Sequence, residues 1–387
     1  MKYIDEFRDR KIAAALAREI RSSAGPTAPP VFMEVCGTHT MNIRKFGIHE
    51  MLEDAVRLVS GPGCPVCVTP DSFLDKAIIL ARTTGVTIAT FGDMMRVPGS
   101  RSSLLEERSK GADVRVVYSC MDALALAERH PKQEVAFLGV GFETTAPSVA
   151  FSVREAKRRS LRNYSVLCAH KTMPSALRAL ATGRGSGKID GFLLPAHVSA
   201  IIGTRPYRFL ASSLGKRCVV AGFEPLDILQ GILMLIRQAI PAVQVQYSRV
   251  VKPEGNASAR SIMREVFEEC EGEWRGIGVI AGSGLKIRKR YARFDADARF
   301  APQASRARRQ KGCICGAVLR GAKVPPDCPL FGSSCTPETP RGPCMVSAEG
   351  TCSAYFKYRE CTTHDTRHRT PACPHSIACR RAGTTQG

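Results

Sequence analysis

Six cysteines crowd a short stretch near the end of the chain. The stretch spans residues 311–352 and contains Cys313, Cys315, Cys328, Cys335, Cys344 and Cys352. Their spacings match neither the paired C-x2-C hooks of a zinc ribbon nor the cysteine run of a bacterial ferredoxin. Because thiolates prefer soft metals and clusters, the candidates are an iron-sulfur cluster, structural zinc or unligated thiols. A four-iron cluster would use four of these six thiols and leave two over.

A second pair of cysteines lies in residues 60–70, SGPGCPVCVTP. Cys64 and Cys67 follow an expected strand, and a helix is expected after them, with Thr69 as its cap and Pro70 as its first residue. At such a junction the helix N-terminus can acidify the first thiol of a redox dithiol. From the residues alone, half of a zinc site or two buried thiols remain alternatives.

Cys36 ends another expected strand, in EVCGTHTMNI, and His39 follows three residues later. A cysteine and a histidine at this spacing could ligate a metal or form a nucleophile pair. The alternative is a buried core cysteine beside a surface histidine.

Two carboxylates also follow expected strands. Asp93 lies in FGDMMRVPGS, and Glu143 stands beside Thr144 in GFETTAP. These groups suit proton transfer or the binding of a polar ligand, but each could equally cap a helix. Four other cysteines have no partner by spacing and are interpreted as core residues, namely Cys120, Cys168, Cys218 and Cys270.

Short apolar runs alternate with helical stretches before the cysteine-rich part, which is typical of parallel sheets with crossover helices. The expected strands are 31–35, 56–61, 86–92 and 114–119 in the first half, and 135–140, 164–170, 189–197 and 217–224 in the second. The two sets are offset by about 104 residues, which indicates an internal repeat. We therefore predict an α/β fold class with two similar parallel-sheet lobes and a small cysteine-rich domain.

The predicted domains are an N-terminal helix (1–28), lobe 1 (29–130), lobe 2 (131–285), the cysteine-rich domain (286–358) and a tail (359–387). A helix over 224–240, a strand over 242–251 and a helix over 257–272 complete lobe 2. Ligands of such sheets bind beyond the carboxyl ends of the strands. The motifs around Cys36, Cys64, Asp93 and Glu143 are therefore expected around one cleft.

Composition narrows the class of protein. The first residues form an amphipathic helix pattern and not a signal peptide, and no apolar run is long enough for a membrane span, so the prediction is cytoplasmic. The 16 cysteines then favour metal or redox chemistry over disulfides. The net charge of +21 suggests a polyanion, but no nucleic-acid motif or stacking platform accompanies it, so we expect no nucleic-acid partner.

Five motifs in order carry a resemblance to a known family. EVCGTHT, GPGCPVCVTP, FGDMMRVPGS, GFETTAP and the stretch from KGCICGAVLRG to SAYFKY together resemble the HypD family of hydrogenase maturation factors, over about residues 3–358. The resemblance implies a scaffold that works with the chaperone HypC to assemble the Fe(CN)2CO group of [NiFe]-hydrogenases. It also implies that cyanide arrives as a thiocyanate on the carboxy-terminal cysteine of HypE, and that a third domain holds a [4Fe-4S] cluster.

The same resemblance assigns roles to individual residues. The family's cluster pattern, C-x14-C-x6-C-x16-C, falls on Cys313, Cys328, Cys335 and Cys352. Cys315 and Cys344 are then a redox-active pair beside the cluster. The resemblance places Cys64 and Cys67 in the cleft, and it makes Cys36 a ligand of the iron together with a cysteine of HypC. We expect these three cysteines to form the iron site.

Our hypothesis is that electrons pass from the cluster to Cys315 and Cys344, then to Cys64 and Cys67, and finally to substrate near Cys36. The four other candidates would orient the cyano group or supply protons: His39, Asp93, Glu143 and Thr144. The alternatives are a zinc-stabilised docking scaffold without redox activity and a stand-alone thiol oxidoreductase. The tail departs from the family pattern, and we expect it to be disordered.

Overall fold

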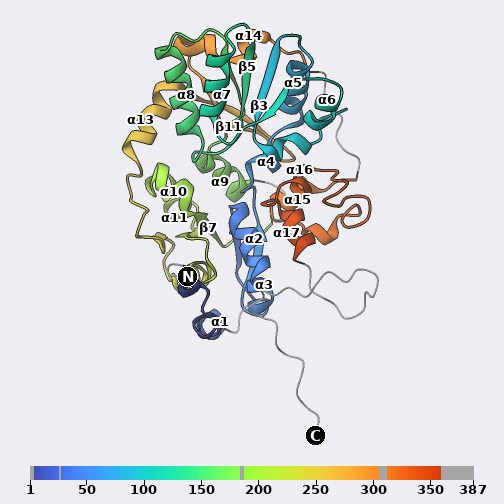
Figure 1. Cartoon of the computed structure of the whole chain (residues 1–387). Helices are drawn as coiled ribbons and strands as arrows, with labels where there is room; N and C mark the ends of the chain where they lie inside the picture. The colour runs from blue at the N-terminus through green and yellow to red at the C-terminus, as the bar shows by residue number, and fades with distance from the viewer. Residues whose placement is uncertain (1–3, 26–27, 184–186, 305–311, 359–387) are drawn as a thin grey trace.

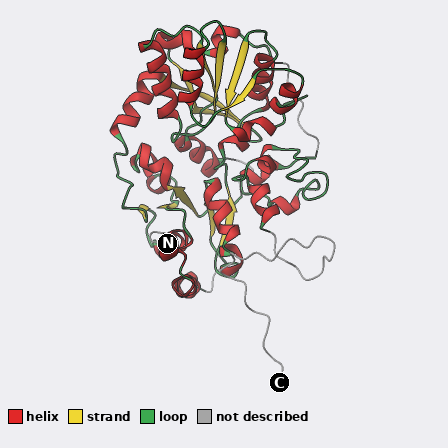
Figure 2. Cartoon of the chain, viewed as in Figure 1, coloured by secondary structure: helices red, strands yellow, loops and turns green. Residues whose placement is uncertain are grey.

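Two parallel β-sheets form the framework of the protein (Figures 1 and 2). A computed structural model describes residues 4–25, 28–183, 187–304 and 312–358; the predicted tail lies outside them. Sheet A has the order β2-β1-β7-β8-β9, and sheet B has the order β4-β3-β5-β6. The strands of sheet A are β1 (Val31–Glu34), β2 (Arg57–Ser60), β7 (Gly191–Pro195), β8 (Arg217–Ala221) and β9 (Val243–Val245). Those of sheet B are β3 (Val86–Thr90), β4 (Val114–Val116), β5 (Glu134–Gly139) and β6 (Tyr164–Cys168). The predicted α/β class with parallel sheets is confirmed.

The predicted grouping of the strands into contiguous lobes is wrong. β1 pairs with β7, and β3 pairs with β5, so each sheet takes strands from both halves of the chain. Hydrophobic runs indicate that a strand is buried on both faces, but they do not indicate its neighbours. Four strands of sheet A, in the order β2-β1-β7-β8, nevertheless match the four strands of sheet B, in the order β6-β5-β3-β4. Each strand matches the one about 104 residues away in the sequence. The repeat itself stays a prediction.

Helices cover both faces of sheet A. On the outer face, α1 (Arg10–Ala24) packs on α12 (Pro225–Arg237). The Asp9 side chain caps α1 by accepting from the backbone N–H of Lys11, and α1 buries Ala13, Ala17 and Ile20 on one stripe. The other helices beside this sheet are α2 (Gly37–Lys45), α3 (Ile48–Met51), α10 (Ala196–Ile202) and α11 (Arg208–Ser212), with the short turns η1 (Asp5–Arg8) and η3 (Arg205–Tyr207).

Sheet B is covered in the same way. Its outer face buries Val135, Phe137 and Val166 against α7 (Cys120–Arg129) and α8 (Ala146–Arg158). A capping box between Ser119 and Asp122 fixes the start of α7. The helices of this lobe are α5 (Asp71–Ala81), α6 (Leu104–Ser109), α7 (Cys120–Arg129), α8 (Ala146–Arg158) and α9 (Met173–Thr182), with the turn η2 (Gly92–Arg96).

One apolar cluster connects the two sheets. It includes Met33 and Phe192 of sheet A, Ile88 and Leu138 of sheet B, and Trp274 of a hairpin between them. Cys64, Cys67 and Cys344 belong to the same cluster. The cysteines of interest therefore lie where the two sheets meet.

An antiparallel hairpin replaces the second half of a predicted helix. α13 (Ala257–Val266) ends six residues before the predicted end at 272, and β10 (Phe267–Trp274) pairs with β11 (Gly278–Ile287). After Val266 the burial alternates, as in a strand with one buried face. The following η4 (Lys289–Phe294) and α14 (Ala296–Phe300) pack against β6, so this stretch accompanies sheet B and not the cysteine-rich part.

The cysteine-rich segment, residues 312–358, contains only short helices: α15 (Cys315–Leu319), η5 (Pro325–Asp327), α16 (Pro343–Val346) and α17 (Thr351–Lys357). Figure 1 shows them in orange and red beside α2 and α4 (Pro65–Val68). α17 packs on α2, and α16 packs on α4. Within the described residues, no helix combines the length and the apolar character that a membrane crossing requires.

Candidate functional site

Two turns at the carboxyl ends of neighbouring strands form the base of the site. β1 and β2 pair with Glu34 opposite Ser60, so the turns that follow them lie side by side. Cys36 precedes α2, and Gly63 of the second turn touches it. A Cβ atom on Gly63 would lie 2.2 Å from the Cys36 backbone nitrogen, so only glycine allows this approach. The predicted placement of both cysteine motifs at strand ends is therefore confirmed.

Cys64 itself, and not Thr69, caps the helix of the C-P-V-C motif. Its sulfur accepts a hydrogen bond from the Cys67 N–H at 3.3 Å, and Pro65 is the first residue of α4. Thr69 instead donates through Oγ1 to the Pro65 carbonyl at 2.9 Å, and Pro70 precedes the next helix, α5. The predicted cap is therefore wrong: the expected helix, α5, begins at Asp71, one residue later than predicted, and Thr69 ends a separate short helix, α4, that was not expected.

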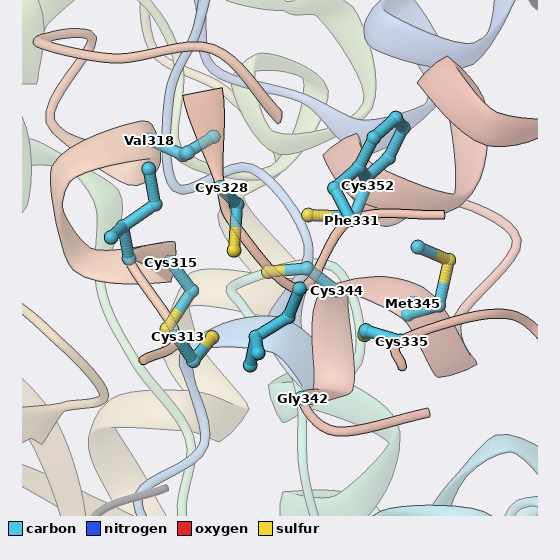
Figure 3. A pocket seen from close by; sticks show the side chains of 12 residues that line it. Cys313, Cys315, Val318, Cys328, Phe331, Cys335, Gly342, Cys344, Met345 and Cys352 are labelled. Atoms are coloured by element: carbon cyan, nitrogen blue, oxygen red, sulfur yellow. The ribbon is translucent and has the colours of Figure 1, made fainter. Parts of the chain in front are cut away.

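All six cysteines of the cysteine-rich segment line one apolar pocket. The other lining residues are Ile314, Val318, Leu330, Phe331, Gly342 and Met345. Figure 3 shows the sulfurs of Cys328, Cys344 and Cys352 pointing into its middle, with Cys313 and Cys315 at one side. Sulfur donors in apolar surroundings suit a soft metal centre. Across the described residues, no three His, Cys, Asp or Glu side chains gather closely enough to hold a single metal ion.

Sulfur contacts continue from this pocket to the C-P-V-C motif. The Cys344 sulfur receives hydrogen bonds from the thiols of Cys352 and Cys67, and these bonds hold the pKa of Cys344 well below its usual value. Burial, with the contacts to Cys344 and Cys64, raises the pKa of Cys67 well above the usual value. The thiols of Cys64, Cys67, Cys344 and Cys352 thus form a continuous series.

A second contact joins Cys313 and Cys315. The Cys315 thiol donates to the Cys313 sulfur and lowers the pKa of Cys313 to about 6, although burial opposes this shift. The same contact and burial raise the pKa of Cys315. Cys36 differs from these cysteines. Burial raises the pKa of its thiol to about 12, and the backbone N–H of His39, which favours the thiolate, opposes this shift only in part.

Contacts at the start of α2 and at η2 dock the cysteine-rich segment on the sheets. Thr38 donates to Glu349 Oε1 at 2.6 Å, and a Cβ atom on Gly37 would lie 2.4 Å from the Glu349 carbonyl oxygen. Ser347 donates to Asp93 Oδ2 at 3.2 Å. Asp93 thus lies beside the cysteine-rich segment, as the prediction of a shared cleft requires. Its carboxylate holds that segment on the sheets through Ser347.

His39 is buried and electrically neutral. Its Nε2–H donates to the Gly222 carbonyl at 2.8 Å, and its ring lies 4.9 Å from that of Phe223. Burial lowers the pKa of His39 to about 4. The predicted surface position is wrong, because α2 turns this face toward β8 and α12. Nδ1 is buried and has no partner among the described residues.

Glu143 and Thr144 do not line the cysteine pocket. Glu143 lines a separate, open pocket of about 630 Å³ with Arg260, Arg264 and Arg288. Its Oε1 accepts from the Met173 N–H at 2.8 Å, and burial raises its pKa to about 7. Thr144 is half-buried next to it. The predicted single cleft therefore divides into two pockets.

Arg275 is a residue of the site that sequence reasoning missed. It lies in the turn of the β10–β11 hairpin, and its guanidinium forms an ion pair with Asp71. The glycines of W-R-G-I-G, between one short run with Phe and Trp and another with Val and Ile, are the hairpin signal that was available in the sequence. This hairpin signal is difficult to recognise, because the residues before it continue the helical pattern of α13.

Comparison with known proteins gives consistent matches. The family profile described as "HypD: Hydrogenase formation hypA family" matches residues 11–359. Hydrogenase maturation factor HypD2 of Bradyrhizobium diazoefficiens is 48% identical over 377 residues, covering 95% of this chain and 99% of the relative. HypD of Cupriavidus necator is 48% identical, with 92% and 97% covered, and HypD of Escherichia coli is 45% identical, with 93% and 99% covered. The similarity spans both sheets and the cysteine-rich segment.

Proposed function

The chain belongs to the HypD family of hydrogenase maturation factors, and from this premise we propose that it is the scaffold on which cyanide is transferred to iron. Its partners would be a HypC-type chaperone, which shares the iron, and a HypE-type protein, which delivers cyanide as a thiocyanate. The product would be the Fe(CN)2CO group of a [NiFe]-hydrogenase, whose large subunit receives it indirectly.

One observation carries this proposal: Cys64, Cys67 and Cys344 lie in the same buried apolar cluster, Cys352 packs against it, and α16 packs on α4. Thiol-disulfide exchange requires a thiolate to reach a sulfur of the other pair directly. The contact between Cys67 and Cys344 is the place where two dithiols, Cys64/Cys67 and Cys315/Cys344, can exchange.

The iron that is being assembled is cargo, and the turn of Cys36 is where we place it. Low-spin iron with cyanide and carbon monoxide prefers soft, strongly donating ligands, and thiolate is such a ligand. Cys36, in contact with the turn of Cys64 and Cys67 through Gly63, offers three thiols at the ends of β1 and β2. Backbone N–H groups near Cys36 favour the thiolate form of its side chain. Binding of iron would displace the thiol proton.

Release of cyanide from a thiocyanate needs two electrons. The sulfur-carbon bond breaks, cyanide leaves with the bonding electrons, and the partner's cysteine becomes a thiolate. Cys64 and Cys67 supply both electrons by forming a disulfide, and their two protons pass to the partner thiolate and to solvent. Exchange through Cys67 and Cys344 then restores the dithiol and leaves a Cys315–Cys344 disulfide. A one-electron carrier protein would reduce that disulfide in two steps.

The pocket residues fit a [4Fe-4S] cluster. Cys313, Cys328, Cys335 and Cys352 line the pocket together with apolar side chains, which is the chemistry that cluster ligation requires. When bound there, a cluster would supply electrons one at a time. Cys315 and Cys344 line the same pocket and would remain as the adjacent dithiol.

The cysteine spacing favours this reading over a zinc-stabilised scaffold. The pattern C-x14-C-x6-C-x16-C of Cys313, Cys328, Cys335 and Cys352 is not that of a zinc ribbon, and it matches the cluster pattern of the family to which the chain belongs. A stand-alone oxidoreductase would have no use for the additional thiol of Cys36.

Two measurements test the proposal. Anaerobically purified protein should contain about four iron and four sulfide per chain, and zinc without sulfide would contradict it. In the complex with a HypC-type partner, Cys67→Ala should abolish cyanide transfer from a thiocyanated HypE-type protein while iron and sulfide stay bound. Cys218→Ala, a buried cysteine of β8, is the matched control and should transfer cyanide normally. Full transfer by Cys67→Ala would remove the dithiol from the mechanism.

A further inference from the structure

The Glu143 pocket, which Glu143 lines with three arginines, takes no part in the proposed cyanide transfer. Its volume is about 630 Å³, which is typical of small-molecule sites, and its lining residues in the described part of the chain include no cysteine. The start of α9, the helix α13 and the β10–β11 hairpin form most of its wall, on the sheet B side. Ile202 of α10 and Pro206 of η3 contribute from the sheet A side. The pocket therefore lies between elements of both sheets, where ligand sites are common.

One end of the Glu143 pocket is rich in hydrogen-bond acceptors. Glu143 is 2% exposed; its Oε1 accepts from the first backbone N–H of α9, and Oε2 has no partner among the described residues. Thr172 Oγ1 donates to the Gly282 carbonyl at 3.1 Å, so its lone pairs remain available. A Cβ atom on Gly282 would lie 3.6 Å from Ser175 Oγ and 3.9 Å from Glu269 Oε2, which places both oxygens next to this glycine. Two carboxylates and two hydroxyls attract a cation that donates hydrogen bonds, such as an ammonium group.

Arginines surround the rest of the opening. Arg260 and Arg264 lie one turn apart on α13, and Arg288 Nε donates to two carbonyls at the end of that helix, at 2.8 and 2.9 Å. Glu268 forms an ion pair with Arg288 at 3.5 Å. Arg260 donates only to a carbonyl, that of Glu254, and the exposed Arg264 side chain has no hydrogen bond or ion pair with another described residue. Two guanidinium groups thus keep their charge for a carboxylate, which they match in geometry.

Apolar side chains lie between the two ends. Met263, Phe267 and Leu285 line the pocket, and Leu285 lies on β11 between the glycine of the acceptor end and Arg288. Such a wall suits a hydrocarbon chain. Burial raises the pKa of Glu143 to about 7, and an ammonium group beside it would favour the carboxylate. A ligand cation would supply the partner that the buried Oε2 lacks.

We propose that the Glu143 pocket binds an ω-amino acid, with its ammonium group against Glu143 and its carboxylate against Arg260 and Arg264. In this class of molecule an apolar chain joins the two charged groups, as the apolar wall between the two ends of the pocket requires. Lysine has this form both as a free amino acid and at the carboxyl end of a peptide. The inference goes beyond the proposed function and is independent of it, because no cysteine takes part.

The test is isothermal titration calorimetry of the complete protein with γ-aminobutyrate, δ-aminovalerate and ε-aminocaproate, at about pH 8, where amines are protonated. We expect one of these chain lengths to bind best. The alkylamine and the alkanoate of the same length each lack one charged group. Each should bind about tenfold more weakly or worse, since a hydrogen bond to a charged group contributes at least that much.

Two variants separate the ends of the pocket. Glu143→Gln keeps an oxygen for the N–H of α9, and it should weaken binding of the ω-amino acid and of the alkylamine about tenfold without affecting the alkanoate. Arg264→Gln should weaken binding of the ω-amino acid and of the alkanoate without affecting the alkylamine. A general loss of structure would weaken all three ligands. Arg293→Gln is the control, because Arg293 is an exposed arginine outside this pocket.

The outcomes decide the proposal and the source of the ligand. Tighter binding of Nα-acetyl-lysine than of lysine would assign the pocket to the carboxyl end of a peptide, and the reverse order to a free amino acid. If no ω-amino acid binds, or if the alkanoate or the alkylamine binds equally well, the proposal is wrong. Binding that neither Glu143→Gln nor Arg264→Gln changes would place the ligand elsewhere and would also overturn it. None of these results bears on cyanide transfer, so the proposed function stands or fails separately.

Discussion

The two sheets and the cysteine-rich segment meet at the site, but they are stabilised in different ways. The sheets bury large apolar side chains on both faces, among them Phe32, Phe137 and Phe192, which are all 0% exposed. In the segment, residues 312–358, the buried apolar side chains include Val318, Leu319, Met345 and Ala354. A core of that size is small for a segment of this length, which agrees with the proposal that a cluster on its cysteines contributes to its stability.

This difference explains how the cysteines are divided. Cys36, Cys64 and Cys67 are held by turns of the sheet region, whose geometry is set by packing and needs no metal. The four cysteines that we propose as cluster ligands, Cys313, Cys328, Cys335 and Cys352, all lie in the cysteine-rich segment and line its pocket. Cys344 connects them, because it packs in the core cluster and also lines the pocket. We expect the two regions to respond differently to the same perturbations.

Removal of iron gives the largest expected difference. Cys328→Ala, or chelation of iron from the reduced protein, should make the segment sensitive to trypsin, because its short helices lose the centre that joins them. The sheets should remain folded, and far-UV circular dichroism should change little. Fragment masses after limited proteolysis measure the effect, with Cys120→Ala in α7 as the control. A segment that stays resistant without iron would show that its own packing is sufficient.

Gly63→Ala changes a residue on the sheet side of the site. It should lower the free energy of unfolding by about 3 kcal/mol, because the added methyl group has no space. A Cβ atom there would lie 2.2 Å from the Cys36 nitrogen and 2.3 Å from its Cα. Because that contact is between two backbones, no side-chain movement relieves it. Urea unfolding measures the loss, which should be the same with and without iron.

Gly92→Ala is the matched control for Gly63→Ala. A Cβ atom on Gly92 would lie 3.8 Å from its nearest neighbour, a Val116 methyl group, which is an ordinary contact. We expect a change below about 0.5 kcal/mol. Equal losses for the two variants would mean that backbone mobility, and not the contact with Cys36, sets the cost.

The sequence was sufficient for local structure and insufficient for the arrangement in space. Each of the eight strands expected for the two lobes forms, starting within two residues of the predicted start and ending one to three residues before the predicted end, because apolar runs and flanking glycines are local signals. The assignment of strands to sheets could not be predicted, since pairing of β1 with β7 depends on contacts across about 160 residues. The capping of α4 by Cys64 and the packing of Arg275 against α4 and α5 are likewise products of tertiary structure, and no spacing in the sequence encodes them.

The pH dependence of stability should distinguish the two regions, because Glu143 lies in the sheet region. Burial raises its pKa to about 7 from 4.5, so the folded protein keeps a proton that the unfolded chain has released. The stability contributed by the neutral group is present below about pH 4.5 and is lost as the pH rises to about 7. The pKa difference corresponds to about 3 kcal/mol.

Glu143→Gln is neutral at every pH and keeps an oxygen for the Met173 N–H. We therefore expect its free energy of unfolding, relative to that of the wild type, to rise by about 3 kcal/mol between pH 4.5 and pH 8. The exposed Glu271→Gln should show no such trend. A flat difference for Glu143→Gln would mean that this carboxyl group is ionised in the folded protein.

The smallest expected effect tests the junction between the regions. The Arg44 guanidinium lies 3.6 Å from the centre of the Tyr355 ring, where α2 meets α17 of the cysteine-rich segment. Arg44→Lys keeps the charge but loses the planar stacking, at a cost of about 1 kcal/mol. Arg178→Lys removes an equivalent stack on Phe209, at 3.8 Å, that lies away from the segment. Arg44→Lys alone should therefore speed proteolysis of residues 312–358, about fivefold if cleavage follows the equilibrium opening of the segment. Equal acceleration by both variants would mean that the segment opens together with the sheets, which would remove the distinction between the two regions.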